Sequence, residues 1–338
     1  MKPQAYTEFQ PLEEVLVGRN FDPKVVDEYD ALPKVKSLLK RLLEETEEDF
    51  QHLIKVCKTY GAKVIRPNYD YSKIKNFEYP FLNQPRDCTI VMGDKIIIGL
   101  DHKEYLKSMA MCLIKYKDHF IIQRRKLNHL QCPSIVRLGQ DILADVAEDG
   151  VKETHWEFLK NRFPKLNFKH NKLTKNVESK TTSLHSDAIF AILKPGLIIT
   201  EKKSHLYSEL YPGWEIIEVD RNFDKMYKWI HGLKDKVMPY FYTFENTEYH
   251  QEAFYQYINK WLTHWVGYSE ETVWDINCLV LDEENVVFSS ENKELFKKLE
   301  KHKINPIVSP YRHRWFWDGG IHCITLDIKR KGGCERYL

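Results

Sequence analysis

The feature that most restricts the fold of this chain is a short unit that recurs along it. Each copy has an apolar strand, a polar or glycine-containing turn and a second apolar strand, which is the pattern of a β-hairpin. The copies are DCTIVMGDKIIIGL, PSIVRLGQDILADV, SDAIFAILKPGLIIT and INCLVLDEENVVFSS, beginning near residues 87, 133, 186 and 275. Helix-like stretches such as ENKELFKKLEKHK separate them. A repeat of this kind predicts similar units arranged radially, with few exposed strand edges.

The two ends of the chain supply strands for a fifth unit. These are EEVLVGR at residues 13–19 and IHCITLDIKR at residues 321–330, and pairing them would close the ring. No Pro/Gly/Ser-rich linker interrupts the series, so we predict one α/β domain over residues 1–338. The alternative is a two-domain α+β chain. Helical spacing of apolar residues predicts one long helix from Pro33 to Tyr60, with its acidic middle in solvent and Gly61 ending it.

Charge and cysteine usage limit the partners. The 51 basic and 49 acidic side chains leave a net charge of +2, which predicts neither a nucleic acid nor an anionic membrane as partner. No apolar run is long enough to span a membrane, and the N-terminus has no signal-peptide pattern. The seven cysteines include no Cys-x-x-Cys pair, which favours free thiols in a reducing cytoplasm over a structural zinc site.

Polar residues interrupt the apolar strands at their ends or turns. In a ring of hairpins such positions can converge on a central cavity; the residues concerned are Asp87, Asp141, His185, Asp187 and Cys323. Carboxylates hold a planar guanidinium through paired charge-assisted hydrogen bonds, and a thiolate can attack its central carbon. A histidine can then transfer protons, with a carboxylate orienting it. Asp87 and Asp187 are therefore predicted to bind substrate, and Asp141 to orient the histidine.

Each of these residues also has an ordinary structural interpretation. Asp141 follows Gly139 and suits a turn, whereas Asp87 suits the start of a strand. The His-x-Asp pair at residues 185–187 has half of a metal-binding pattern, but no second cluster has ligand spacing. Cys323 alone is more typical of a core residue. Strand alternation places His322 on the opposite face from Cys323, which predicts a structural role for it.

At these positions the sequence resembles the amidinotransferase family typified by glycine amidinotransferase. The resemblance covers most of the chain in order, through YTEFQPLEEVLVGR, QPRDCTIVMGDKII, IVRLGQDILAD, LHSDAIFAILKPGLIIT and DGGIHCITLDIKRKG. It implies a five-bladed, pseudosymmetric α/β-propeller of ββαβ-type units around a central active-site cavity. It also implies ping-pong transfer of an amidino group from L-arginine to an acceptor amine, without metal or cofactor, and makes a homodimer an expectation.

Carried over by motif, the resemblance assigns a role to each of these residues. Cys323 is the nucleophile, His185 the general acid and base, and Asp141 its partner, while Asp87 and Asp187 hold the guanidinium. Cys323 is then expected to be abnormally reactive, because a cationic histidine nearby lowers a thiol pKa.

Several positions depart from the family pattern or extend it. Asp318 replaces a third glycine before the nucleophile, and the loop after Thr200 has Lys202 and Lys203 but no arginine. Asp275 replaces a serine, which favours an amine-bearing substrate end if it faces the cavity. Arg312 matches a family arginine that contacts substrate or braces its loop. The neighbouring aromatic residues, Trp315, Phe316 and Trp317, are expected to shape the cavity mouth or an interface, or to pack.

These observations leave more than one function open. The first is an amidinotransferase that uses arginine as donor, with an unsettled acceptor amine. The second is a hydrolase of a guanidino compound, in which water resolves the same covalent intermediate. The third is a guanidino-binding protein without catalysis. The nucleophile, the histidine and the carboxylates serve both enzymes, so the site residues do not separate them.

Overall fold

The structure is a computed structural model of the chain. It describes residues 1–28, 32–68, 83–99, 103–122, 130–144, 146, 151–170, 185–201, 204–219, 252, 275–317 and 319–338, apart from the side chains of residues 104, 315 and 316.

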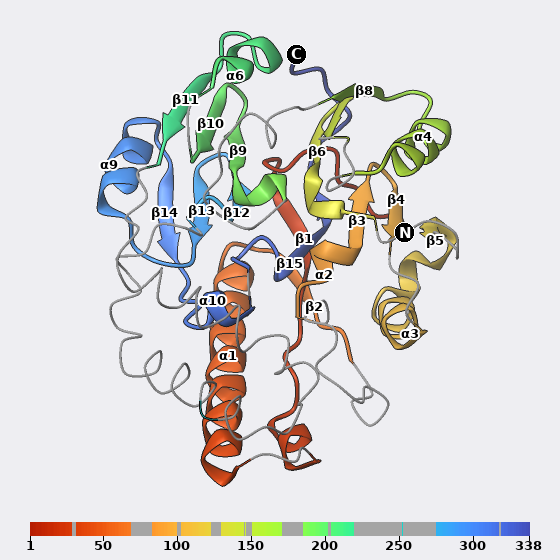
Figure 1. Ribbon diagram of the computed structural model, residues 1–338. Helices are drawn as coiled ribbons and strands as arrows, with labels where there is room; N and C mark the ends of the chain where they lie inside the picture. The colour runs from red at the N-terminus through yellow and green to blue at the C-terminus, as the bar shows by residue number, and fades with distance from the viewer. Residues whose placement is uncertain are drawn as a thin grey trace.

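The strands of the described residues form five three-stranded sheets, arranged in a ring around a common centre (Figure 1). We call each sheet with its helix a blade. In every blade an antiparallel pair of strands is followed by a helical segment and then by a third strand, parallel to the second. This is the ββαβ propeller that the family resemblance implies, and it agrees with the radial arrangement of hairpins that the repeat predicts. The expectation of a single domain over residues 1–338 stays a prediction.

The blades follow the order of the chain, except that blade 1 combines both ends. Blade 1 contains β15 (Thr325–Arg330), β1 (Leu12–Val17), α1 (Pro33–Thr59) and β2 (Lys63–Ile65). Blade 2 contains β3 (Thr89–Met92), β4 (Lys95–Ile98), α3 (Lys103–Cys112) and β5 (Phe120–Ile122). Blade 3 contains β6 (Ile135–Leu138), β7 (Asp141–Ala144), α4 (Glu153–Arg162) and β8 (Asn167–His170). Blade 4 contains β9 (Phe190–Lys194), β10 (Leu197–Thr200), α6 (His205–Leu210) and β11 (Glu215–Glu218). Blade 5 contains β12 (Leu279–Asp282), β13 (Asn285–Phe288), α9 (Lys293–Lys301) and β14 (Asn305–Val308).

Short helical segments complete the described structure. They are η1 (Pro23–Glu28), α2 (Pro85–Cys88), η4 (Ile114–His119), η5 (Cys132–Ser134), η6 (Ser186–Ala188) and α10 (Arg314–Trp317). Three of them, α2, η5 and η6, lead directly into the first strands of blades 2, 3 and 4. Within the described residues, no helix has the length and apolar character needed to cross a membrane.

The first and last strands close the ring, as predicted. β1 and β15 are antiparallel, with Val17 opposite Thr325, and the N–H of Gly18 extends the pairing by donating to the carbonyl of Ile324 at 2.8 Å. Glycine is required at position 18 because a Cβ there would lie 1.9 Å from the carbonyl oxygen of Asn83. The predicted strand over residues 321–330 is shorter than expected, because residues 321–324 form a turn.

The long helix is confirmed as α1, and Gly61 follows it in the left-handed region at φ +86°. The prediction that its acidic middle faces solvent is wrong for Glu45 and Asp49, which are buried. Both carboxylates hydrogen-bond to the segment before α10, where Arg312 and His313 lie. These polar contacts fix α1 against the segment that leads to the Cys323 turn.

Candidate active site

The pseudosymmetry places five short segments at one end of the ring, each just before the first strand of a blade. They are α2, η5, η6, residues 275–278 and the turn at 321–324. Asp87, Asp187 and Cys323 lie on three of these segments and are all buried. Blades that are far apart in the sequence therefore bring two carboxylates and a thiol to one place, as the repeat predicts.

The Cys323 turn is held by a buried asparagine. The side-chain oxygen of Asn277 accepts hydrogen bonds from the backbone N–H groups of His322 (3.0 Å) and Cys323 (3.1 Å), and its Nδ2 donates to the carbonyl of Asp187 at 3.3 Å. The Gly-Gly pair before the turn makes this approach possible. A Cβ on Gly320 would lie 2.7 Å from Asn277 Oδ1, and one on Gly319 would lie 3.2 Å from Cys323 Sγ.

Asp187 contacts both residues of this turn. Its Oδ2 atom lies 2.8 Å from Nδ1 of His322 and 3.9 Å from Sγ of Cys323. The prediction that His322 points away from Cys323 and is structural is wrong in its reasoning, because strand alternation does not apply inside a turn. Both side chains instead meet the same carboxylate. Burial opposes ionisation of Asp187, but the His322 hydrogen bond and the charge interactions with His322, His185 and Arg86 together hold the pKa of Asp187 below its usual range.

The thiol of Cys323 is protonated more strongly than we expected. Burial raises its pKa well above the usual range, and the carboxylates of Asp187 and Asp87 raise it further. The expectation of a constitutively activated thiolate is therefore wrong for this state of the site. A cation placed between the two carboxylates would remove the electrostatic part of this effect.

His185 hydrogen-bonds to a residue that the sequence analysis did not select. Its Nε2 atom lies 2.9 Å from Oε1 of Gln131, the residue just before η5. Asp141 was expected here, but it begins β7 at the hairpin end of blade 3, opposite Leu138 and ion-paired with Lys169 at 2.9 Å. The site end of this strand is Ala144, which pairs with Ile135. Three strand residues, about 10 Å, thus separate Asp141 from the site end, so this assignment is corrected.

Arg312 braces a loop. Its Nε and backbone N–H both donate to Asp49, at 2.6 and 2.7 Å, and its Nη2 donates to Glu48 at 2.8 Å. Of the two roles predicted for this arginine, the structure supports the structural one. Trp317 also packs: its indole donates to Thr46 and its ring stacks on Phe21.

Asp275 is held by the start of α9. Its carboxylate accepts hydrogen bonds from Ser290 (3.1 Å) and from Asn292 (3.0 Å), the residue that caps this helix. This contact fixes the turn before β12 to the helix of the same blade. These hydrogen bonds support a structural role for this carboxylate, and its selectivity for an amine-bearing substrate stays a prediction. Lys202, Lys203, Asp318 and the side chains of Trp315 and Phe316 lie outside the described residues.

Glu8 is a site residue that the sequence analysis missed. It accepts two hydrogen bonds from Arg137, at 2.7 and 2.5 Å, and its Oε2 lies 3.5 Å from Nε2 of His322. Burial opposes its ionisation, but Arg137 and His322 hold its pKa well below the usual range. The available signal was one acidic residue between Thr7 and Phe9 in the segment YTEF, ahead of the first strand.

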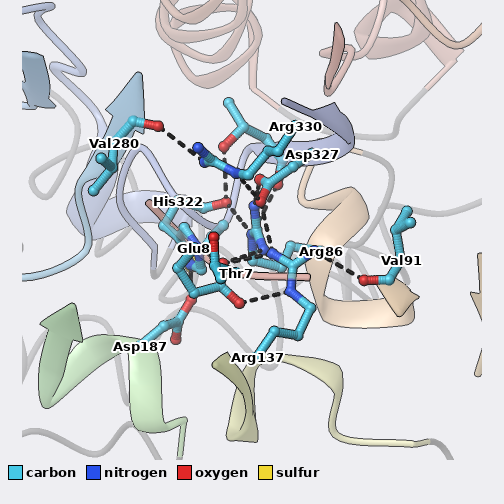
Figure 2. A network of polar contacts seen from close by, with 12 residues as sticks. Thr7, Glu8, Arg86, Val91, Arg137, Asp187, Val280, His322, Asp327 and Arg330 are labelled. Carbon is cyan, nitrogen blue, oxygen red and sulfur yellow. Dashed lines mark hydrogen bonds and ion pairs between the residues drawn. The ribbon is translucent and has the colours of Figure 1, made fainter. Parts of the chain in front are cut away.

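Behind Glu8 lies a buried cluster of arginines. Arg86, Arg137 and Arg330 all contact the carboxylate of Asp327, and Figure 2 shows the chain of contacts running from this cluster through Glu8 and His322 to Asp187. A cavity of about 30 Å³ has Glu8, His322 and Asp187 in its wall, with apolar side chains of blades 3, 4 and 5 around them. A volume of this order holds one or two water molecules.

In the parts of the chain that the structure describes, no group of three or more His, Cys, Asp or Glu side chains is placed to hold a metal ion. The expectation of a reaction without metal or cofactor stays a prediction.

Related proteins of known function are amidinotransferases. Inosamine-phosphate amidinotransferase 1 of Streptomyces glaucescens is 23% identical, with 98% of both chains aligned. Mitochondrial glycine amidinotransferase of Xenopus laevis is 23% identical over 99% of this chain and 84% of its own length. L-arginine:L-lysine amidinotransferase of Pseudomonas savastanoi pv. phaseolicola is 25% identical over 46% of this chain, and that alignment spans 33% of the relative. No family model matches the sequence.

Solved structures with the same fold belong to the same group and to a hydrolase. SxtG, an amidinotransferase from Microseira wollei, has a TM-score of 0.68 at 17% identity, with 99% of both chains covered. Inosamine-phosphate amidinotransferase StrB1 from Streptomyces griseus has a TM-score of 0.66 at 20% identity, with the same coverage. A dimethylarginine dimethylaminohydrolase has a TM-score of 0.59 at 12% identity, covering 93% of this chain and 99% of its own. Over nearly its full length, the chain is therefore similar in sequence to amidinotransferases and shares their five-bladed fold.

Proposed function

We propose that this protein transfers the amidino group of L-arginine to an acceptor amine through a covalent amidino–Cys323 intermediate, releasing ornithine. The observation that carries the proposal is the placement of the Cys323 thiol 3.9 Å from the buried Asp187 carboxylate. The Oδ1 atom of Asp187 is also buried, and it has no hydrogen-bond partner among the residues that the structure describes. An N–H donor of a guanidinium satisfies such an oxygen, and the cationic charge balances the carboxylate.

The binding step brings a cation to the two aspartates. A guanidinium held by Asp187 and Asp87 neutralises the two carboxylates that raise the pKa of Cys323, so the thiol ionises more readily once substrate is bound. The charge of the substrate then faces Asp187, while the His322 imidazole keeps its contacts with Asp187 and Glu8. Substrate binding and activation of the nucleophile are thereby coupled.

The chemistry then follows as two displacements at one carbon. The Cys323 thiol gives its proton to His185 as Sγ adds to the guanidinium carbon. The bond from that carbon to the Nδ of the ornithine portion breaks, and His185 passes the proton to the leaving amine. The acceptor amine next adds to the same carbon and gives a proton to His185. The C–S bond breaks and His185 returns this proton to Sγ, which restores the thiol and yields the new guanidino compound.

The acceptor can be an amino acid or another amine. The names of the relatives include glycine, lysine and inosamine phosphate. The carboxylate of Asp275 hydrogen-bonds Ser290 and Asn292, so its selectivity for a diamine stays a prediction. A hydrolase is the second candidate, because the fold neighbours include a dimethylaminohydrolase and the same thiol, histidine and carboxylates serve that reaction.

The test is intact-protein mass spectrometry after incubation with arginine alone. We expect a gain of one amidino group in the wild type, with ornithine released, and no gain in Cys323→Ala. Cys278→Ala is the matched control, because it removes another buried thiol and should still form the adduct. Candidate amines are then added one at a time to find the one that discharges the adduct. Citrulline and ammonia formed without an amine would establish the hydrolase instead, and no reaction of arginine at all would overturn both.

A further inference from the structure

Gln131 and His185 occupy corresponding positions in neighbouring blades. Gln131 immediately precedes η5, which leads into the first strand of blade 3, and His185 immediately precedes η6, which leads into the first strand of blade 4. The repeat therefore brings the two side chains together at the site end of the ring, where Nε2 of His185 meets Oε1 of Gln131 at 2.9 Å. The contact follows from the pseudosymmetry of the fold.

We propose that Gln131 is the positioning residue of His185, so that a neutral amide does the work that a carboxylate does in a Cys-His-Asp arrangement. This inference rests on the proposed function, since it gives His185 its orientation for acid–base transfer. Residues 130–144 contain one carboxylate, Asp141, and that residue lies at the hairpin end of the blade in an ion pair with Lys169. The amide of Gln131 is the group from blade 3 that reaches the imidazole.

The contact fixes the tautomer of His185. The amide oxygen accepts a hydrogen bond, so Nε2 carries the proton and Nδ1 keeps the lone pair in the neutral imidazole. Nδ1 is then the atom that accepts a proton from the incoming amine and returns one to the leaving amine. An amide also stabilises a facing imidazolium less than a carboxylate does.

An uncharged partner also suits the charge of the site. Asp187 lies two residues after His185 and interacts with it electrostatically, and Asp187 and Asp87 both act on Cys323. A further carboxylate at position 131 would bind the imidazolium and compete with substrate for positive charge. The amide positions the ring and leaves the two aspartates as the negative groups for the guanidinium.

Gln131→Glu and Gln131→Ala test this inference. In Gln131→Glu the hydrogen bond is kept and a charge is added, so the pKa of His185 is expected to rise by about 1 to 3 units. It is measured by NMR titration of labelled histidine, with the His185 signal assigned from its loss in His185→Gln. Gln51→Glu, on the exposed surface of α1, makes the same change away from the site and should leave that pKa unchanged.

The kinetic comparison uses the rate of ornithine release. In Gln131→Ala, kcat is expected to fall about 10- to 100-fold with little change in KM for arginine, because the loss is in proton transfer. Gln131→Glu is expected to recover most of the rate, with its pH profile displaced to higher pH. An unchanged His185 titration in Gln131→Glu, or a wild-type pH profile in Gln131→Ala, would overturn the inference. The His185 titration does not depend on turnover. A protein that failed to form the Cys323 adduct would refute the proposed function, and the titration would still test whether Gln131 positions His185.

Discussion

Nδ1 of His322 lies 2.8 Å from Oδ2 of Asp187, the carboxylate oxygen that also faces the Cys323 thiol. The imidazole thus contacts one oxygen of the carboxylate and leaves Oδ1 without a hydrogen-bond partner among the described residues. Through Glu8, the same imidazole reaches the buried arginine cluster (Figure 2). The substrate site and the charged centre of the propeller are therefore one continuous network, and changes to Asp187 act on both.

Asp187→Asn is expected to impair arginine binding severely. The variant keeps the size of the side chain but loses the negative charge, and a charge-assisted hydrogen bond contributes about 1.5 to 3 kcal/mol. The value of kcat/KM for ornithine release should fall at least about 10- to 100-fold, mainly through KM. Steady-state kinetics measure this effect. Asp275→Asn is the control, as it removes a buried carboxylate bound to Ser290 and Asn292, and it should lower stability while leaving KM near the wild-type value.

Cys323 is expected to react slowly with a neutral alkylating agent in the absence of substrate. Its thiol is buried, and Asp187 and Asp87 raise its pKa further, so little thiolate is present at neutral pH. The rate at which iodoacetamide labels Cys323 at pH 8 is followed by peptide mass spectrometry. It should be at least about tenfold lower in the folded protein than in the chain unfolded in urea, because a rise of about one unit or more in the thiol pKa reduces the thiolate fraction by about that factor. Asp87→Asn should accelerate labelling because it removes one negative neighbour. Labelling of the folded protein as fast as the unfolded chain would contradict the electrostatic description of the site.

Stability is expected to fall as the pH rises above about 8.5, the pKa of a thiol in an unfolded chain. Burial raises the pKa of Cys57 to about 12, and it raises the pKa values of Cys88, Cys132, Cys278 and Cys323 as well. Above pH 8.5 the unfolded chain therefore binds fewer protons than the folded protein, which favours unfolding. Each thiol that stays protonated in the folded state lowers the free energy of unfolding at pH 10 by about 2 kcal/mol relative to its value at neutral pH.

Urea unfolding at pH 7, 9 and 10 measures this loss. Tyrosines with raised pKa values lower the stability over the same pH range. The contribution of one thiol is therefore obtained by comparing the wild type with a variant that lacks it. Cys132→Ala should have a shallower fall between pH 8.5 and 10 than the wild type, whatever its stability at pH 7. Equal slopes in the two proteins would show that this thiol titrates normally in the folded state.

The repeat predicted the fold well because it depends on local patterns. Apolar strands joined by polar or glycine-containing turns specify each hairpin, and the leftover strands at the two chain ends specify the closure between β1 and β15. Cys323, Asp87 and Asp187 were found for the same reason, since each precedes the first strand of a blade. The side-chain partners were harder to predict. Asp141 and Gln131 lie ten residues apart in one hairpin unit, and only the register of blade 3 shows which of them reaches His185.

The wrong predictions for Glu45 and Asp49 have a common physical cause. Both residues belong to a polar stretch that usually faces solvent, yet both are buried because Glu45 pairs with His313 and Asp49 with Arg312. Pairing of this kind depends on how α1 packs against a segment more than 250 residues away in the chain. A single sequence contains no pattern for that packing.

Asp141→Asn is expected to leave the reaction intact. Asp141 lies at the hairpin end of blade 3 and pairs with Lys169, which is 42% exposed, so the change removes an interaction within one blade. Stability should fall by about 1 to 3 kcal/mol, and kcat for ornithine release should stay within about threefold of the wild type. Thermal unfolding and initial rates measure the two effects. A loss of rate comparable to that of His185→Gln would restore Asp141 as the partner of the histidine.

Gly320→Ala is expected to prevent formation of the Cys323 adduct without unfolding the protein. A Cβ at this position would lie 2.7 Å from Oδ1 of Asn277 and 2.9 Å from its carbonyl oxygen, so either the turn or the asparagine must move. Asn277 holds the N–H groups of His322 and Cys323, and its displacement moves the thiol relative to Asp187. A misplacement of about 1 Å costs about 100-fold in rate.

The stability of Gly320→Ala should fall by only about 1 to 3 kcal/mol, the usual cost of an overpacked site. Gly333→Ala is the matched control, because a Cβ on Gly333 meets no atom within 4 Å, and it should form the adduct at the wild-type rate. Mass spectrometry of the arginine adduct and urea unfolding are measured on both variants. Wild-type adduct formation in Gly320→Ala would show that the Asn277 contact does not position the nucleophile.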